Sequence, residues 1–294
     1  MRVAVVGLGG VGGYLAAKFA QAGVDIVGFA RGEHLREIQK NGLTIKEDEK
    51  EFTIALSAKE LREAEGSFDI VLFCVKSYDI EQSYKEIAAC VSEKSILISF
   101  SNGVDNGDKL RAISHARVLD GVIYILSHIE KAGVIRKKGK VFAAVFGGEK
   151  EATQELATLF EKADLRFKTP SDIQTAIWKK YIFIAAFATL TSYYDKPILT
   201  IYKEHYDEAK RLLEEIAAVA RSRGIMIDDE IEKALGTASK LPADASTSMH
   251  LDFQNRNQTE LESLTGFIAN SKGVEHKSFS YIYEQLKERA LLNK

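Results

Sequence analysis

The sequence predicts an α/β protein in two parts, a parallel-sheet domain over residues 1–169 and an all-helical domain over residues 170–294. Three observations predict this fold class. A short apolar strand meets a glycine-rich turn and a helix near the N-terminus, strand-like and helix-like segments then alternate, and from Ile173 onward only helical periodicity remains. The chain has 294 residues, of which 46% are hydrophobic, enough to build two sizeable cores.

The first strand and its turn carry the strongest motif in the chain. Val3–Val6 has the composition of a buried parallel strand, and Gly10–Ala22 continues with helical periodicity. Between them lies a G-x-G-x-x-G motif, whose first glycine permits a tight turn, whose second lets the backbone approach a pyrophosphate, and whose third lets the helix pack closely on the strand. The motif therefore predicts a Rossmann-type domain whose helix N-terminus binds the cofactor phosphates. The predicted phosphate-binding residues are Gly7, Leu8, Gly9, Gly10, Val11 and Gly12.

The end of the second predicted strand indicates which dinucleotide binds. The strand Asp25–Ala30 is followed by Arg31, where an NAD site would have an acidic residue for the ribose 2′-hydroxyl. A guanidinium suits a 2′-phosphate instead, so the predicted cofactor is NADP(H). The alternative is that Arg31 is simply a solvated charge at a strand end. His34, in the following helix that ends at Gly42, either contacts a ligand or is an ordinary polar residue of the first turn.

Polar side chains also follow two later strands. The apolar run Phe68–Val75 is typical of a central parallel strand, and it ends in Lys76, where side chains of an open α/β sheet meet ligands. Asn102 follows the strand 95–100 and offers both a donor and an acceptor. A solvated lysine and a turn asparagine are the alternatives. Further strands are expected at 117–126, 133–137 and 141–146 and a helix at 150–163, and residues 166–170 close the domain.

Charge and composition exclude several classes of partner. Lys and Arg total 40 against 42 acidic residues, and the net charge of −2 offers no general attraction to nucleic acid or to an anionic membrane. Cys74 and Cys90 have neither metal-ligand spacing nor a disulfide framework, so no metal is expected. The apolar run 182–191 is shorter than the ~20 residues that span a bilayer, and we expect no signal peptide before the first strand. We expect a cytoplasmic monomer or homodimer that acts on a small molecule.

The second half of the chain is predicted to be helical, with the substrate bound between the two domains. Its most informative helix contains Lys180, Ile184 and Ala188, which share one face that is apolar apart from the lysine. Burial lowers the pKa of an ammonium group and would help it donate a proton near neutral pH. The alternative is a lysine whose head group reaches water from a helix end. The predicted helices are 173–193, 203–223, 229–240, 245–255, 260–271 and 277–292.

A second polar cluster lies between residues 246 and 260. Hydroxyls such as that of Ser248 near a helix start are usually N-caps, and Glu260 is typical of a first helical turn. Spacing alone assigns these residues no further role.

Taken together, these segments resemble the ketopantoate reductase (2-dehydropantoate 2-reductase) family, and the likeness runs over nearly the whole chain. The resemblance implies that Arg31 is the 2′-phosphate ligand. The matching pieces are Gly7–Gly12, Arg31 to Leu35, Gly42–Leu43, Cys74–Lys76, Ser101–Gly103, Trp178 with Lys180, Arg223–Ile225, Ser248–Met249, and Thr259–Glu260 before Gly266–Phe267.

The resemblance also implies roles in the reaction. Lys180 matches the catalytic lysine, which polarises and protonates the 2-keto oxygen while NADPH delivers hydride to that carbon. Glu260 matches the catalytic-site acid that binds the substrate hydroxyl, and Ser248 matches the hydroxyl that bonds the substrate carboxylate. Lys76 and Asn102 match positions near the nicotinamide and the reacting ketone.

One departure from the family pattern concerns the substrate. The family usually has asparagines four and eight residues after the catalytic lysine, whereas this chain has Ile184 and Ala188. The leading hypothesis is NADPH-dependent reduction of 2-dehydropantoate to pantoate in pantothenate biosynthesis. The alternatives are reduction of a different 2-oxo acid and a non-catalytic NADP-binding sensor. A sensor needs neither Lys180 nor Glu260, which argues against it.

Overall fold

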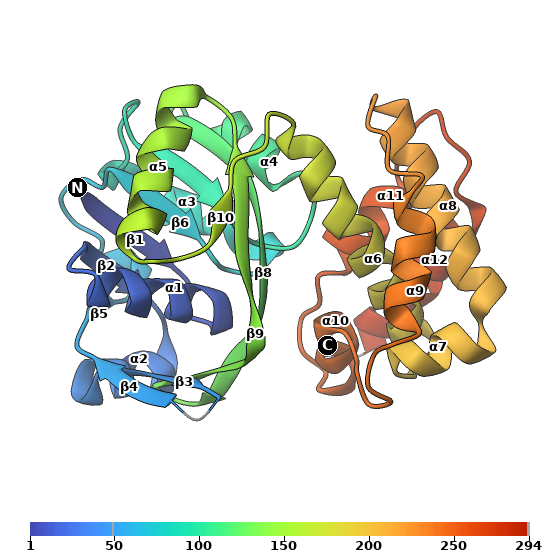
Figure 1. The fold of residues 1–294 in the computed structure, drawn as a ribbon, viewed down its shortest axis with the longest axis horizontal. Coiled ribbons are helices and arrows are strands. Elements are labelled where there is room, and N and C mark those ends of the chain that lie inside the picture. The colour runs from blue at the N-terminus through green and yellow to red at the C-terminus, as the bar shows by residue number, and fades with distance from the viewer. Residues whose placement is uncertain (49, 293–294) are drawn as a thin grey trace. The chain divides into compact units, whose positions relative to one another are not determined.

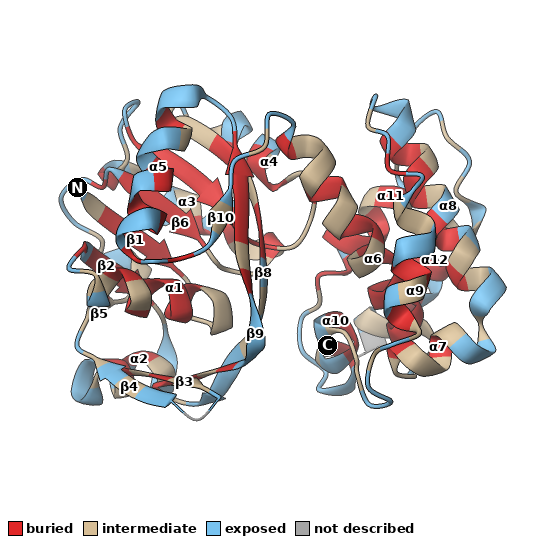
Figure 2. Cartoon of the chain, viewed as in Figure 1, coloured by how far each residue is buried: buried red, intermediate tan, exposed pale blue. Residues whose placement is uncertain are grey.

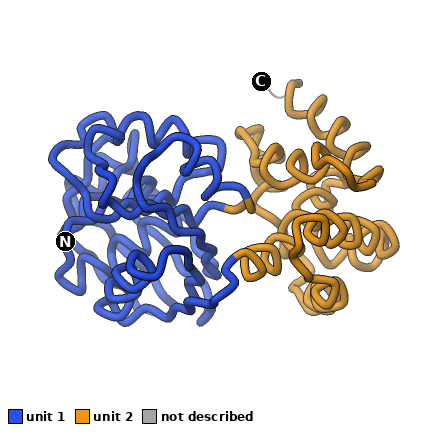
Figure 3. The backbone as a smooth tube through the Cα atoms, turned by 90° about the horizontal axis from the view of Figure 1, so that it is seen from above, with its two compact units in different colours: residues 1–101, 105–173 blue, residues 102–104, 174–294 orange. Residues whose placement is uncertain are grey.

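The computed structural model describes residues 1–48 and 50–292. The chain divides into two compact units, the first comprising residues 1–101 and 105–173 and the second residues 102–104 and 174–294 (Figure 3). The predicted fold class, a sheet domain with parallel pairing followed by a helical region, is confirmed. The assignment of cofactor binding to residues 1–169 and of substrate binding to residues 170–294 stays a prediction, and residues 293–294 of that second range lie outside the described residues.

In the described part of the first unit, ten strands form one sheet in the order β4-β3-β9-β8-β7-β6-β1-β2-β5, and β10 pairs with β9 (Figure 1). The run from β5 to β8 is parallel throughout, whereas β8 and β9 pair antiparallel as a long hairpin. The strands are β1 (Arg2–Val6), β2 (Asp25–Phe29), β3 (Leu43–Glu47), β4 (Lys50–Ile54), β5 (Ser57–Lys59), β6 (Ile70–Phe73), β7 (Ile96–Ser99), β8 (Arg117–Lys131), β9 (Val134–Gly147) and β10 (Phe167–Lys168).

Helices cover both faces of this sheet. In β1, Val3 and Val5 belong to a core shared with α1 and α5, while Ala4 and Val6 belong to a second core shared with α3 and α4. Because alternate side chains of a strand point to opposite faces, a strand buried on both sides must be apolar throughout. Figure 2 shows this burial along the central strands. The helices are α1 (Gly10–Gln21), α2 (Gly32–Asn41), α3 (Ile80–Ile87), α4 (Asn106–Ile113) and α5 (Lys150–Lys162), with 3₁₀ turns η1 (Leu61–Glu63), η2 (Ser77–Asp79) and η3 (Ala88–Cys90).

One prediction for this unit was wrong in detail. Residues 133–137 and 141–146, expected as two short strands, belong to the single strand β9. Its partner β8 is also longer than expected, and the register between them shifts at two irregularities, Ile125/Ser127 and Ile129/Lys131. The polar residues and the glycine in the middle of β9 interrupt its apolar pattern, which is why two strands were expected. Pairing with β8 along the whole length keeps β9 continuous.

The second unit is helical in its described part. Its helices are α6 (Ile173–Tyr194), α7 (Ile198–Glu204), α8 (Tyr206–Ser222), α9 (Glu230–Ala238), α10 (Ser248–Gln254), α11 (Phe267–Ala269) and α12 (Lys277–Leu292), with the π-helical turn η4 (Glu262–Gly266) before α11. The apolar face of α8, including Leu212, Leu213 and Ile216, is buried, and α8 packs against α9 and α12. No helix within the described residues is long and apolar enough to cross a membrane.

Three predicted helices differ from the observed ones. The expected helix 203–223 corresponds to α8, which begins only at Tyr206, because residues 203–204 are the end of α7, a helix that was not predicted. The helix expected from residue 245 begins at Ser248, because Thr247 accepts a hydrogen bond from the backbone N–H of His250 as an N-cap. The helix expected over 260–271 begins with a π-helical turn.

Candidate active site

The glycine motif forms the turn between β1 and α1. Gly7 has a φ of +95°, which only glycine adopts easily. A side chain on Gly12 would lie 2.0 Å from the carbonyl oxygen of Gly7, whereas a side chain on Gly9 would meet nothing within 4 Å. The first and third glycines are thus required by the fold itself, while the second leaves open space beside the backbone.

The start of α1 suits an anion. Its first turn contains no acidic residue, and Gly9 at the N-cap has no side chain with which to satisfy the free N–H groups. Those N–H groups and the positive end of the helix dipole favour a phosphate. Gly10 packs so closely on β8 that an added Cβ would lie 2.4 Å from the Ser127 carbonyl oxygen. The residues present therefore fit the pyrophosphate of a dinucleotide.

Arg31 and Lys76 follow the two strands that pair with β1. Because β2 and β6 both run parallel to β1, the two residues lie at the same carboxyl edge as the glycine turn. The Arg31 side chain is 89% exposed, and its Nη2 lies 3.8 Å from Oδ2 of Asp79. Lys76 is the N-cap of η2, and its carbonyl oxygen accepts from the Asp79 N–H at 2.9 Å. An exposed guanidinium is thus present where a 2′-phosphate is expected.

Lys180, Asn102 and Glu260 come together in the second unit. The Nζ of Lys180, in α6, donates to Oδ1 of Asn102 at 3.2 Å. Desolvation by burial lowers the pKa of the Lys180 ammonium to about 8, and the negative charge of Glu260 opposes that shift. An ammonium with this pKa is a proton donor close to neutral pH.

Glu260 lies where the π-helical turn begins. The residue is only 4% exposed, and its carbonyl oxygen accepts from the Leu264 N–H at 3.1 Å. The hydroxyl of Tyr181 donates to the carbonyl oxygens of Ser263 and Leu264, at 3.1 and 2.8 Å, so α6 holds the turn directly. Single π-helical turns occur frequently at functional sites. Sequence periodicity did not predict this turn, because it changes the helix phase by only one residue.

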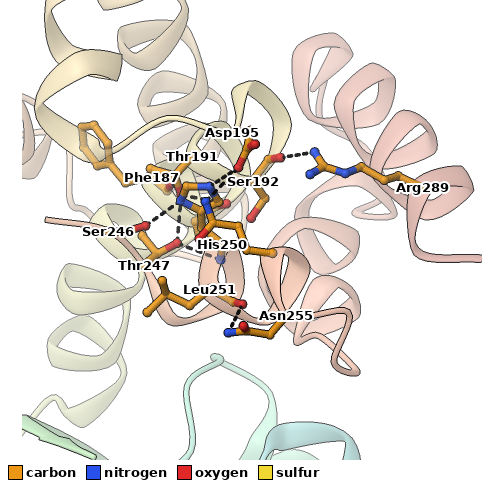
Figure 4. A network of polar contacts seen from close by, with 12 residues as sticks. Phe187, Thr191, Ser192, Asp195, Ser246, Thr247, His250, Leu251, Asn255 and Arg289 are labelled. Carbon is orange, nitrogen blue, oxygen red and sulfur yellow. Dashed lines mark hydrogen bonds and ion pairs between the residues drawn. The ribbon is translucent and has the colours of Figure 1, made fainter. Parts of the chain in front are cut away.

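Ser248 is exposed at the first position of α10. It lies beside a partly buried polar network that periodicity also did not predict, shown in Figure 4. The Oγ of Ser246 lies 2.6 Å from Nδ1 of His250, and Nε2 of His250 lies 2.7 Å from Oδ1 of Asp195. The hydroxyls of Thr191 and Thr247 are hydrogen bonded to each other at 2.8 Å. These contacts anchor the start of α10 to the end of α6, and the substrate role of Ser248 stays a prediction.

The cysteines of the described chain add no further chemistry. Burial raises the pKa of the Cys74 thiol to about 12, so the thiol stays protonated at neutral pH. Among residues 1–48 and 50–292, no group of three or more His, Cys, Asp or Glu side chains is arranged to hold a metal ion.

Comparison with known proteins gives a consistent result. The family model for ketopantoate reductase PanE/ApbA matches residues 3–148, and the model for its C-terminal domain matches residues 172–290. The uncharacterized oxidoreductase YkpB of Bacillus subtilis is 29% identical over 91% of each chain, and a 2-dehydropantoate 2-reductase of Mesorhizobium japonicum is 26% identical over 91% of this chain and 90% of its own. The crystal structure of a PanE/ApbA family ketopantoate reductase from Ralstonia eutropha superposes with a TM-score of 0.92, at 24% identity, over 100% of this chain and 99% of that one.

Proposed function

The chain belongs to the ketopantoate reductase PanE/ApbA family, whose members are oxidoreductases acting on a CH–OH/C=O group, and on that premise we propose that it reduces 2-dehydropantoate to pantoate with NADPH, a step of pantothenate biosynthesis. The observation that carries this proposal is the Lys180, Asn102 and Glu260 cluster, with the pKa of Lys180 lowered to about 8. A protein that only sensed NADP would have no use for a proton donor of this kind.

The glycine turn and Arg31 would hold the cofactor. The N–H groups at the start of α1 would bind the pyrophosphate, and the exposed Arg31 guanidinium would pair with the 2′-phosphate. NADPH, when bound, supplies the hydride that the keto carbon accepts. The preference for NADPH over NADH rests on Arg31 and on the missing acid at that strand end.

Lys180 would supply the proton. As the keto carbon accepts hydride, its oxygen gains negative charge, which a nearby ammonium stabilises strongly in a site with little water. Lys180 Nζ then gives its proton to that oxygen, so the 2-oxo acid becomes a 2-hydroxy acid and the lysine is left neutral. The carboxylate of Glu260 favours the charged lysine, because it raises the pKa that burial lowers. Asn102 orients the ammonium through its 3.2 Å hydrogen bond.

A specific observation favours a second candidate, reduction of a 2-oxo acid that lacks a hydroxyl group. Ile184 and Ala188 lie one and two helical turns beyond Lys180 on the same face of α6, and neither can hydrogen bond a substrate through its side chain. A polar group of the substrate buried against this face without a partner would cost about 1–3 kcal/mol.

The test is NADPH oxidation followed by absorbance, first with ketopantoate and then with other 2-oxo acids, with Lys180→Ala as the blank. Turnover that depends on Lys180 with ketopantoate supports the first candidate. NADPH binding with turnover only on 2-oxo acids without the hydroxyl supports the second. Binding without any turnover would leave only a cofactor-binding role.

A further inference from the structure

His34 contacts the glycine turn from outside the motif. It lies in the first turn of α2, half-buried, with its Nε2 2.8 Å from the carbonyl oxygen of Leu8. Its Nδ1 accepts a hydrogen bond from the backbone N–H of Gly133, at the turn of the β8–β9 hairpin, over 3.0 Å. One imidazole therefore joins three segments of the first unit.

These partners determine the protonation state of the ring. Since Nδ1 accepts from a backbone N–H, it carries no proton, and the proton of the neutral ring must be on Nε2, where it is donated to the Leu8 carbonyl. Adding a second proton would place an N–H on Nδ1 directly against the Gly133 N–H. Burial lowers the pKa of His34, with the Leu8 hydrogen bond acting in the opposite direction, so the neutral form is the one the fold favours.

The Leu8 carbonyl matters because it belongs to the same peptide unit as the Gly9 N–H. The Leu8–Gly9 peptide bond is trans, so its C=O and N–H point in opposite directions. The Leu8 N–H is already held by the carbonyl oxygen of Phe29 at 3.1 Å. That N–H belongs to the preceding Gly7–Leu8 peptide unit, so it restrains the chain on one side of the Leu8 Cα. The contact of His34 with the Leu8 carbonyl restrains the Leu8–Gly9 peptide on the other side, and the Gly9 end of that peptide lies where an added Cβ would meet nothing within 4 Å.

The same helix start carries Arg31. Arg31 is the N-cap of α2, and His34 is the third residue after it. A hydrogen bond from His34 to the glycine turn therefore joins the segment proposed to bind the 2′-phosphate to the segment proposed to bind the pyrophosphate. The charged residues within three sequence positions of His34 or Gly133 are Arg31, Glu33, Arg36, Glu37, Glu130, Lys131 and Arg136, while Gly7–Gly12 carry no charge.

We propose that His34 is a positioning residue for the dinucleotide: in its neutral form it locks the Leu8–Gly9 peptide so that the Gly9 N–H is presented to the pyrophosphate, and its protonation releases that lock. This inference rests on the proposed cofactor role of the glycine turn. It makes His34 part of the cofactor site without direct contact with the cofactor.

The experiment measures the Kd of NADP⁺ by titration calorimetry at pH 7.5 and 5.5 for the wild-type chain, His34→Ala and His34→Gln. Glutamine offers an NH₂ group as donor and a carbonyl oxygen as acceptor, and it does not titrate. We expect His34→Ala to bind roughly three- to tenfold more weakly at pH 7.5, the loss of one hydrogen bond, and His34→Gln to bind close to wild type. Arg36→Ala, an exposed change on the same helix, should leave the Kd unchanged.

The pH comparison separates positioning from a merely structural role. The 2′-phosphate of NADP⁺ also titrates near pH 6, but it does so equally for every variant. For each protein we therefore take the ratio of the Kd at pH 5.5 to the Kd at pH 7.5. Dividing the wild-type ratio by the His34→Gln ratio leaves the effect of the histidine. We expect wild type to lose more affinity on acidification than His34→Gln. Equal losses, or a folded His34→Ala that binds as wild type does, would overturn the inference alone. A wild-type chain that binds no NADP⁺ would overturn the proposed function and this inference with it.

Discussion

The Nζ of Lys180 donates a hydrogen bond to Oδ1 of Asn102 across 78 positions of the sequence, at 3.2 Å. Asn102 follows the last residues of β7, yet it groups with the helical unit rather than with the sheet. The pair places the proposed proton donor beside a side-chain amide, a group whose NH₂ is the kind of donor that binds a carbonyl oxygen. The role of Lys180 as proton donor can be tested by replacing that residue alone.

Replacing Lys180 should remove turnover and keep cofactor binding. We expect Lys180→Ala to lower kcat by ~10²–10⁴-fold, the usual contribution of a positioned general acid, while the Kd of NADPH changes little. Lys179→Ala is the matched control, because its neighbouring ammonium pairs instead with Glu230 at 3.4 Å. If the two variants turn over equally fast, Lys180 is not the acid.

The rate of reduction should fall as pH rises through about 8. Below that value Lys180 is protonated and can donate, whereas above it the neutral amine cannot. The reverse reaction should show the opposite slope, because it needs the neutral amine as a base. Glu260→Gln removes the charge that raises the pKa of Lys180, so the inflection should move to lower pH. A pH–rate profile of both proteins with saturating substrate checks this, and an inflection that stays in place would show that Glu260 does not act on Lys180.

Removing Arg31 should weaken NADPH binding selectively. We expect Arg31→Ala to lower the affinity for NADPH by tenfold or more, in line with ~1.5–3 kcal/mol for a hydrogen bond to a charged group, with little effect on NADH. Fluorescence titration with both cofactors measures this. Similar losses for NADPH and NADH would refute the phosphate role. Asp79→Asn, which removes the acid near Arg31, should strengthen NADPH binding.

Two glycines of the turn should differ in what they control. Gly12→Ala should destabilise the fold, because the added methyl would lie 2.0 Å from the Gly7 carbonyl oxygen. Gly9→Ala should unfold at nearly the wild-type temperature, since its methyl meets nothing within 4 Å, yet should bind NADPH more weakly because it occupies the space left for the pyrophosphate. Thermal unfolding and NADPH titration of both variants test the contrast. Normal NADPH binding by Gly9→Ala would mean that the phosphates do not approach there.

Substrate preference should depend on Ile184. A matched pair of substrates is ketopantoate and 3,3-dimethyl-2-oxobutanoate, which is the same 2-oxo acid without its hydroxyl. If the face around Ile184 lines the substrate, Ile184→Asn should shift the ratio of kcat/KM towards ketopantoate, because an amide can pair with the hydroxyl. Ile184→Val controls for loss of volume. An unchanged ratio would show that this face does not contact the differing end of the substrate.

Local pattern was enough to predict much of this molecule. Three local features indicated the fold class: the glycine spacing between an apolar strand and a helix, the apolar central strands, and the change to helical periodicity near Ile173. Each depends only on residues close together in the sequence, and the structure confirms the fold class that they indicate. The bounds of α2 and α5 also lie within a residue or so of the expected ones. These features are determined by sequence alone, because steric freedom at glycine and the burial of alternate or every-fourth side chains are local properties.

Other features were decided only by the tertiary structure. No spacing relates Asn102 to Lys180, or His34 to the Leu8 carbonyl and the Gly133 N–H, because each contact joins segments distant in the chain. The length of β9 follows from pairing with β8, and the pKa of Lys180 follows from burial and from Glu260. Sequence determined which residues are able to bind a dinucleotide and donate a proton. Packing decided which of them meet, since desolvation and long-range hydrogen bonds exist only once the chain has folded.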